Sequence, residues 1–439
     1  MTPERFSVHS SGAEYILSQI ARKSGLADIL KKYYPDTCGL LLDESIRMAC
    51  RDSGIMTEGH FLSGGRVSAL SARTGGSPAR LPAGVTGIAL QDICRDWSGY
   101  LGDPGYAVCG IETSLSRRGT IRDAVPGHDK ARADRPWFGT GVLFNMSSLL
   151  PVSYADFTGR VGGDDYLDSM KSLAVRQGSD RPRFVFGADL FYRLDLGKMH
   201  DAGSIFVAAV PESHPNTANL VEMFMEPIHR RPWIEGFDTC GKSWPCWAGR
   251  APARGHVFLD WPRHDPTTYY RTVNMNIRQL YAVHEAAESG KGPACYVVLT
   301  NDPDLTSGNV LWMFRQNETL QKYSGFSAIQ PESGISGSCM SVENDASRFC
   351  GFLALVLRSI IEKDIRNFKN SKRGISSFRS ELFRRIFRMT TDDILGELSS
   401  IRTVSLSEGK RHRTFLSEIQ MHILDILGVS RDDFINMPS

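Results

Sequence analysis

The segment GTGVLFNMSSLLPVSYADF, residues 139–157, contains two of the runs that decide the fold. Each run is short, apolar and rich in β-branched or aromatic residues, which is typical of a β-strand. Further runs of the same kind lie before and after this segment. The five predicted strands cover residues 106–111, 139–144, 151–157, 184–187 and 205–210.

Apolar residues at helical spacing separate the later strands. They predict helices over 165–173 and 194–201, so the order is three strands, helix, strand, helix, strand. This order is typical of a ribonuclease-H-like α/β core. A last strand over 295–300 precedes a predicted helix over 309–323. The less regular, Trp- and Pro-rich residues 211–290, with a predicted helix near 267–287, suggest an insertion domain.

The bulk composition is that of an ordinary globular protein. The chain has 439 residues, 41% of them hydrophobic and 23% charged, so two or three domains are expected at roughly 150 residues each. The nine cysteines are scattered and form no Cys-x-x-Cys pair, which favours a reducing compartment. Neither a signal peptide nor a membrane-spanning run is found, so a cytoplasmic, nucleoid-associated location is expected.

Helical segments flank the predicted core on both sides. Residues 13–33 form an amphipathic pattern that Gly25 divides into two short helices, and a third helix is expected over 42–52. Residues 63–85 are rich in Gly, Ser, Pro and Arg, as in a connector. The predicted division is a helical domain (1–62), a basic connector and helix (63–100), the first part of the core (101–210), an insertion (211–305), core completion (306–370) and a basic helical region (371–439).

Several phrases resemble the DDE transposases of the insertion-sequence-four type, in their long, insertion-bearing branch. They are GAEYILSQIARKSGLADILKKYYPD (12–36), TSLSRRG (113–119) and the hairpin that follows it, RFVFGADLFYRLDL (183–196), VVLTNDPDLTSGNVLWMFRQNETLQKYSGF (297–326) and the closing helical phrases RFCGFLALVLRSII and LSEIQMHILDILG. Their order and spacing cover most of the chain. The resemblance implies an α/β ribonuclease-H-like core that cuts and joins DNA.

Such a core needs three acidic residues. Two divalent cations, Mg²⁺ or Mn²⁺ and about 3.5–4 Å apart, stabilise the attacking and leaving oxygens, and carboxylates supply the ligands. At the positions that the resemblance implies, this chain has lost these acids. The degraded motif positions are Ile111, Ala188, Phe314, Asn317, Gln321 and Ala328.

An acid nevertheless stands close to each lost position. Glu112 follows Ile111, Asp189 follows Ala188, and Glu318 lies three residues before Gln321. Successive side chains on a strand point to opposite faces, so Glu112 and Asp189 should point away from the expected site unless a bulge or a shifted register intervenes. A shifted catalytic set of Glu112, Asp189 and Glu318 therefore stays as an alternative. Cys240, Cys246 and His256 match no common zinc-site spacing.

Basic residues cluster between 366 and 388. The stretch RNFKNSKRGISSFRSELFRRIFR interleaves phenylalanines with eight Lys or Arg and one Glu, and predicts either a solvated helical face or a phosphate-binding one. In a DNA-handling fold phosphate contact is favoured, with Arg66, Arg73 and Arg80 in support. The candidate DNA-binding residues are Arg366, Lys369, Lys372, Arg373, Arg379, Arg384, Arg385 and Arg388.

Three functions remain open from the sequence. The first is a transposase-derived protein, as a monomer or a homodimer, that binds element terminal repeats in double-stranded DNA but cleaves poorly or not at all. The second is an active DDE transposase with the shifted acids. The third is a non-catalytic regulatory or dimerisation partner of an intact transposase.

Overall fold

The chain folds into two compact units. In the computed structural model the helical unit comprises Met1–Leu101, Leu149–Val152 and Tyr323–Ser439, and the sheet unit comprises Gly102–Ser148 and Ser153–Lys322. The structure describes residues 6–10, 12–51, 87–102, 105–114, 125–126, 136–158, 160–211, 214–225, 234, 239–260, 295–322, 340–372, 382, 385–386, 389–406, 411–413 and 415–430.

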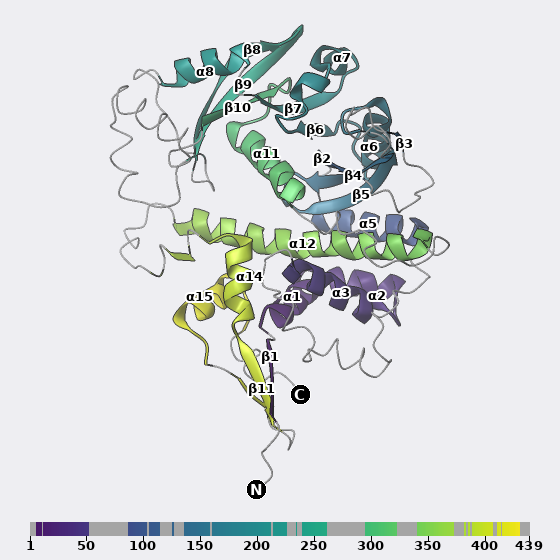
Figure 1. The fold of residues 1–439 in the computed structure, drawn as a ribbon, viewed down its shortest axis with the longest axis vertical. Helices are drawn as coiled ribbons and strands as arrows, with labels where there is room; N and C mark the ends of the chain where they lie inside the picture. Colours follow the sequence, from purple (N-terminus) through teal and green to yellow (C-terminus); the bar gives the residue numbers. More distant parts are fainter. Residues whose placement is uncertain are drawn as a thin grey trace. The chain divides into compact units, whose positions relative to one another are not determined.

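A nine-stranded sheet is the centre of the sheet unit, counted over the described residues (Figure 1). Its order is β3-β4-β2-β6-β7-β10-β9-β8, and β5 pairs with β4. Strands β2, β6 and β7 run parallel, and β4, β10, β9 and β8 join their neighbours antiparallel. The strands are β2 (Tyr106–Ser114), β3 (Val125–Pro126), β4 (Pro136–Asn145), β5 (Pro151–Thr158), β6 (Arg183–Phe186), β7 (Ile205–Val210), β8 (Thr239–Ala248), β9 (Ala251–Asp260) and β10 (Cys295–Thr300).

The predicted strands and intervening helices are confirmed. The structure has α6 (Asp164–Arg176) and α7 (Leu196–Asp201) where helices were expected, and a 3₁₀ turn, Phe191–Arg193, precedes α7. Every residue of β7 is buried. This is the pattern of a parallel strand that is covered on both faces, and it explains why IFVAAV has no polar alternation.

Two helices cover opposite faces of this sheet. Gly110 and Gly141 are in register on β2 and β4, and a Cβ on either would meet α6, at Tyr166 and Met170. On the other face, Trp312 of α11 (Ser307–Lys322) packs edge-on against Phe144 of β4. The glycines therefore let α6 approach the sheet closely, and α11 lies across β2, β6 and β7 from the other side.

The β8–β9 hairpin is a feature that the sequence prediction missed. Ten residue pairs join the two strands, around a turn in which Gly249 has φ 60°. Prolines 245 and 252 and glycines 241 and 255 interrupt the apolar pattern by which strands are recognised. Helix α8 (Pro215–Met225) packs on this hairpin, and the expected helix over 267–287 lies outside the described residues.

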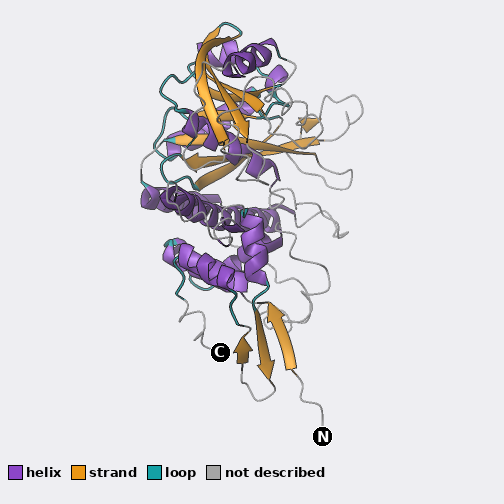
Figure 2. Cartoon of the chain, turned by 90° about the vertical axis from the view of Figure 1, so that its left-hand side faces the viewer, coloured by secondary structure: helices purple, strands orange, loops and turns teal. Residues whose placement is uncertain are grey.

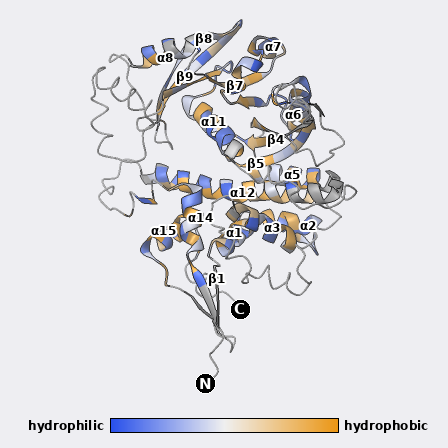
Figure 3. Ribbon diagram, in the orientation of Figure 1, coloured by the Kyte–Doolittle hydropathy of each residue, from blue (hydrophilic) through white to orange (hydrophobic). Residues whose placement is uncertain are grey.

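The helical unit is built around one long helix, α12 (Met340–Lys372). All residues from Phe349 to Leu357 are buried, and the helix becomes polar towards its C-terminal end (Figure 3). Such an apolar run is typical of a helix covered on all sides. The other helices are α1 (Gly12–Lys23), α2 (Leu26–Tyr33), α3 (Cys38–Arg51), α5 (Gly87–Leu101), α14 (Thr391–Ser399) and α15 (Glu418–Ile426).

Helices from both ends of the chain meet in this unit. Gly25, with φ 74°, separates α1 from α2 as predicted. The Cys350 thiol of α12 lies 3.7 Å from the Leu41 carbonyl of α3, and Arg358 donates a 2.8 Å hydrogen bond to the Ala49 carbonyl. A second sheet joins β1 (Phe6–Ser10), β11 (Arg402–Leu406) and β12 (Arg411–Arg413) (Figure 2). None of the described helices is long and apolar enough to cross a membrane.

Candidate functional site

The first expected acid position lies on β2, at the centre of the sheet. Ile111 is buried and in register with Thr140 of β4, and it stands two residues beyond Cys109, which pairs with Val185 of β6. An isoleucine at this point contributes packing and no ligand for a cation. Its neighbour Glu112 is in register with Gly139, whose position belongs to the α6 face. Backbone alternation therefore assigns position 112 to the face opposite α11.

The second expected position does not lie on a strand. β6 ends at Phe186, and Ala188 and Asp189 belong to a turn in which Leu190 N–H donates to the Gly187 carbonyl at 3.2 Å. Both residues are exposed. Strand alternation, from which Asp189 was expected to point away from the site, therefore does not apply to this residue, because alternation holds only within an extended strand.

Helix α11 forms where the third-motif helix was predicted. Asn317 is buried on the face of α11 that holds Val310, Met313 and Leu320. A Cβ built on Gly187 would lie 2.6 Å from Asp189 Oδ1 and 3.6 Å from Asn317 Nδ2. The absence of a side chain at Gly187 thus leaves room for a carboxylate and a carboxamide at the end of β6.

Glu318 belongs to a different part of α11. Arg315 Nη1 donates to Glu318 Oε2 at 2.5 Å, and Arg315 Nη2 donates to the Tyr296 hydroxyl on β10 at 3.1 Å. Phe314 also packs on Tyr296, with ring centroids 5.2 Å apart. This places Glu318 in a cluster with β10. The side chains of Glu112 and Gln321, and all of Ala328, lie outside what the structure describes.

The described residues therefore place one expected acid beside a buried amide. Asp189 and Asn317 meet at Gly187, and the other proposed acids come from different surroundings. No group of three or more His, Cys, Asp or Glu among the described residues could hold a metal ion. A carboxylate and a carboxamide both offer oxygen to a hard cation, but together they supply only one negative charge. Asn317 was predicted only as a degraded motif position, and an amide among the apolar residues of this helix was the available signal for it.

The possible zinc ligands are also separated. Cys240 and Cys246 lie six residues apart on β8, which corresponds to about 20 Å of extended strand. His256 of β9 is in register with Ser243, so it belongs to the opposite face from both cysteines. Its Nδ1 lies 3.0 Å from the Ser307 hydroxyl at the start of α11. These three residues form no common site.

The chain was compared with known families, curated proteins and solved structures. No protein-family model matches the chain, and no curated protein matches it. A solved structure of a piggyBac transposase synaptic complex with hairpin DNA is similar to this chain with a TM-score of 0.27 and 12% identity, over 97% of this chain and 77% of that one. A likeness at this level does not establish a common fold.

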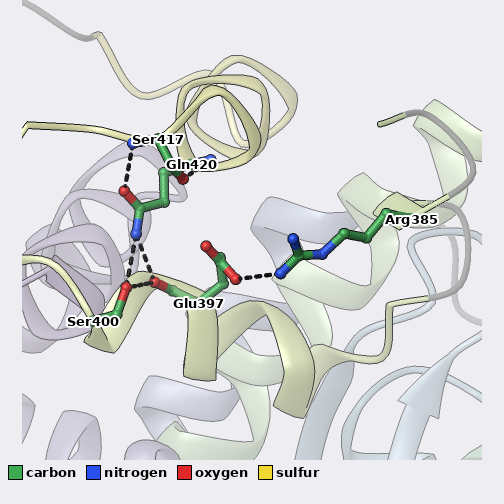
Figure 4. Close-up of polar contacts among 5 residues, drawn as sticks. All are labelled: Arg385, Glu397, Ser400, Ser417 and Gln420. Atoms are coloured by element: carbon green, nitrogen blue, oxygen red, sulfur yellow. Dashed lines mark hydrogen bonds and ion pairs between the residues drawn. The ribbon is translucent and has the colours of Figure 1, made fainter. Parts of the chain in front are cut away.

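Two of the candidate DNA-binding residues are held in ion pairs within the helical unit. Arg366 Nη2 lies 2.6 Å from Glu362 Oε1 along α12, and Arg385 Nη2 lies 3.0 Å from Glu397 Oε2 of α14 (Figure 4). Lys369 and Lys372 belong to the last turns of α12. The other candidates, Arg373, Arg379, Arg384 and Arg388, lie outside the described residues, as do Arg66, Arg73 and Arg80.

Proposed function

We propose that this chain is a transposase-family DNA-binding protein with a ribonuclease-H-like core and impaired strand cleavage. The observation that carries the proposal is the strand order β5-β4-β2-β6-β7 within the sheet. In this order, β4 is antiparallel to β2, β5 pairs with β4, and β6 and β7 run parallel to β2. Helices α6 and α7 lie between the later strands in the sequence. The third-motif helix α11 then crosses β2, β6 and β7, as a core of this class requires.

The residues at the sheet edge support impaired catalysis. Two shared cations, about 3.5–4 Å apart, need several carboxylates that converge on them. Here the first position is a buried isoleucine, and the α11 side chain that approaches Gly187 beside Asp189 is a neutral asparagine. Glu318, the one acid within α11, is paired with Arg315. That ion pair reduces the negative charge that Glu318 could offer to a metal.

A nicking assay tests the catalytic part of this proposal. Supercoiled plasmid DNA is incubated with the full chain and Mg²⁺ or Mn²⁺, and relaxation is measured for the wild type, Asp189→Asn and Asp180→Asn. Asp180 is an exposed acid before β6, so it controls for the loss of surface charge. The expected result is no relaxation by any of the three proteins. Relaxation that Asp189→Asn abolishes and Asp180→Asn retains would instead establish the active enzyme with shifted acids Glu112, Asp189 and Glu318.

DNA binding is tested separately with Arg385. This residue and Arg95 of α5 have equal side-chain exposure, 63%, and each is paired with one acid, Glu397 and Asp92 respectively. We expect Arg385→Gln to weaken binding to a terminal-repeat duplex and to reduce the slope of log affinity against log salt by about 0.9. Arg95→Gln should leave both unchanged. No binding by the wild type, together with co-purification of an intact transposase, would favour the regulatory-partner function.

A further inference from the structure

The parallel strands of the sheet unit end at one edge, where two turns bring three aromatic side chains together. β2, β6 and β7 run parallel, so their C-terminal ends lie at the same edge. Phe191 and Tyr192 belong to the 3₁₀ turn that follows β6, and His214 belongs to the turn that follows β7. The Phe191 ring centroid lies 5.8 Å from that of Tyr192 and 5.1 Å from that of His214. The cluster thus stands at the sheet edge where α/β folds commonly bind ligands.

The rings of this cluster differ in exposure. Phe191 is 8% exposed, whereas Tyr192 is 66% exposed. Backbone hydrogen bonds fix the turn that holds both rings. Phe191 N–H donates to the Ala188 carbonyl at 3.3 Å, and Arg193 N–H donates to the Leu190 carbonyl at 2.8 Å. A buried ring therefore anchors the turn, and Tyr192 is held at the surface in a position that loses little conformational entropy when a ligand covers it.

Charged groups of both signs flank the exposed ring. Asp189 lies three residues before Tyr192 in the same turn, Arg193 follows it, and both are exposed. A guanidinium forms paired hydrogen bonds with phosphate oxygens, and a carboxylate accepts a hydrogen bond from the exocyclic amino group of a base. An aromatic ring offers a stacking surface for the base itself. The segment 189–193 thus contains a group suited to each part of a nucleotide other than its sugar.

We propose that Tyr192 stacks against an unpaired base of a DNA strand at the end of β6. The inference rests on the proposed DNA-binding function and adds to it a contact residue that lies apart from the basic stretch 366–388. The base has to be unpaired, because the stacked pairs of a duplex cover the faces of their neighbours. Every base has such a face, so we expect little preference for sequence and a clear preference for unpaired over paired nucleotides.

A second exposed tyrosine provides a matched control. Tyr100 of α5 is 60% exposed and stacks on Trp97, with ring centroids 5.8 Å apart. It therefore resembles Tyr192 in exposure and in having an aromatic neighbour, but it belongs to the helical unit. Tyr192→Leu and Tyr100→Leu each remove one exposed ring and keep an apolar side chain. Tyr192→Phe keeps the ring, and Tyr192→Gln is a second variant without one.

The experiment measures the affinity of the full chain for three labelled DNAs. They are a single strand of about 12 nucleotides, the same strand with abasic sites in place of its bases, and the fully paired duplex. We expect Tyr192→Leu and Tyr192→Gln to weaken binding to the single strand about tenfold, as the loss of one stacked base does, and to leave the other two affinities unchanged. The salt slope should stay at the wild-type value, because stacking releases no counterions. Tyr192→Phe and Tyr100→Leu should bind all three DNAs as the wild type does.

The results that would overturn the inference differ in what else they remove. Wild-type binding to DNA with unchanged single-strand affinity in both ring-free variants would exclude stacking on Tyr192 and leave the proposed function intact. No binding of any of the three DNAs by the wild type would remove both. Equal weakening for the single strand, the abasic strand and the duplex, or a change in the sedimentation coefficient alone, would assign Tyr192 to the fold or to a protein contact and so overturn base stacking. Circular dichroism shows whether each variant is folded.

Discussion

At the scale of single residues, small side chains decide what can meet at the sheet. Gly187 leaves space in which Asp189 and Asn317 come together, and Gly110 and Gly141 let α6 approach β2 and β4. None of these glycines has a positive φ, because the positive-φ glycines of the described chain lie elsewhere. Their role is therefore steric: each leaves room for a neighbouring side chain that a Cβ at the same position would displace.

Gly139 gives the sharpest test of this steric role. A Cβ at this position would overlap the ring of Phe157, which is buried and packs edge-on against Tyr166 with ring centroids 4.8 Å apart. Because that buried ring would have to shift against Tyr166, we expect Gly139→Ala to lower the free energy of unfolding by about 3 kcal/mol. Urea denaturation measures the change.

Gly99 of α5 provides the control for the same substitution. A Cβ there meets nothing within 4 Å. In a helix interior, alanine is favoured over glycine by about 1 kcal/mol, so Gly99→Ala should stabilise the protein slightly. If both substitutions had equal effects, the clash at Phe157 would not be what determines the cost.

At the scale of elements, the ends of α14 and α15 are joined by one buried side chain. Gln420 Nε2 donates to the Glu397 carbonyl at 3.0 Å and to the Ser400 hydroxyl at 2.8 Å, and its Oε1 accepts from Ser417 N–H (Figure 4). Ser417 Oγ in turn accepts from Gln420 N–H, which completes a capping box at the start of α15. Gln420 thus caps its own helix and fixes it to the last turn of α14.

We expect Gln420→Ala to lower the free energy of unfolding by about 2 kcal/mol, because it leaves buried polar partners without hydrogen bonds. Hydrogen exchange should show faster exchange at the Ser417 and Glu418 amides. The matched substitution Gln177→Ala removes an amide whose buried Oε1 has no hydrogen-bond partner, and it should change stability little. Equal losses in the two variants would contradict the structural role of Gln420.

At the scale of the whole molecule, the two units should respond to pH in opposite directions. Burial, with a smaller contribution from Asp43, raises the pKa of Glu14 in the helical unit from 4.5 to about 7. Burial, with a smaller contribution from Arg254, lowers the pKa of His256 in the sheet unit from 6.5 to about 4. Each shift corresponds to a free-energy difference on the order of 3 kcal/mol between the two protonation limits.

The sign follows from which state binds more protons. Folded Glu14 keeps its proton between pH 4.5 and 7 and unfolded Glu14 loses it, so its contribution to stability is lost as pH rises through this range. Folded His256 is neutral between pH 4 and 6.5 and unfolded His256 takes up a proton, so stability is lost as pH falls through this range. Raising the pH from about 5 to about 7.5 should therefore destabilise the helical unit, which contains Glu14, and stabilise the sheet unit, which contains His256.

Calorimetry at several pH values tests this prediction by measuring the temperature of each unfolding transition. Two unfolding transitions that shift in opposite directions are expected, since each unit has its own core. Glu14→Gln should remove the pH dependence of one transition and His256→Gln that of the other. A single transition, or a pH dependence that both variants retain, would contradict it.

The local pattern of the sequence determined the strands β2, β4, β5, β6 and β7 with the helices α6 and α7, the break at Gly25 and the helix α11. These features follow from hydrophobic periodicity and backbone preference, which act between neighbouring residues. The loss of acids at positions 111 and 188 stays a prediction, because it depends on the resemblance to a family as well as on the residues Ile111 and Ala188.

Tertiary structure alone decided which distant residues meet. It paired residues 6–10 with 402–406, placed Asn317 beside Asp189, put the cysteines of β8 and His256 of β9 on opposite faces, and bound Arg366 and Arg385 to acids. Strand register and side-chain pairing across the chain depend on packing and on the turns that bring segments together. A pattern that repeats every two or four residues carries no information about a partner hundreds of residues away.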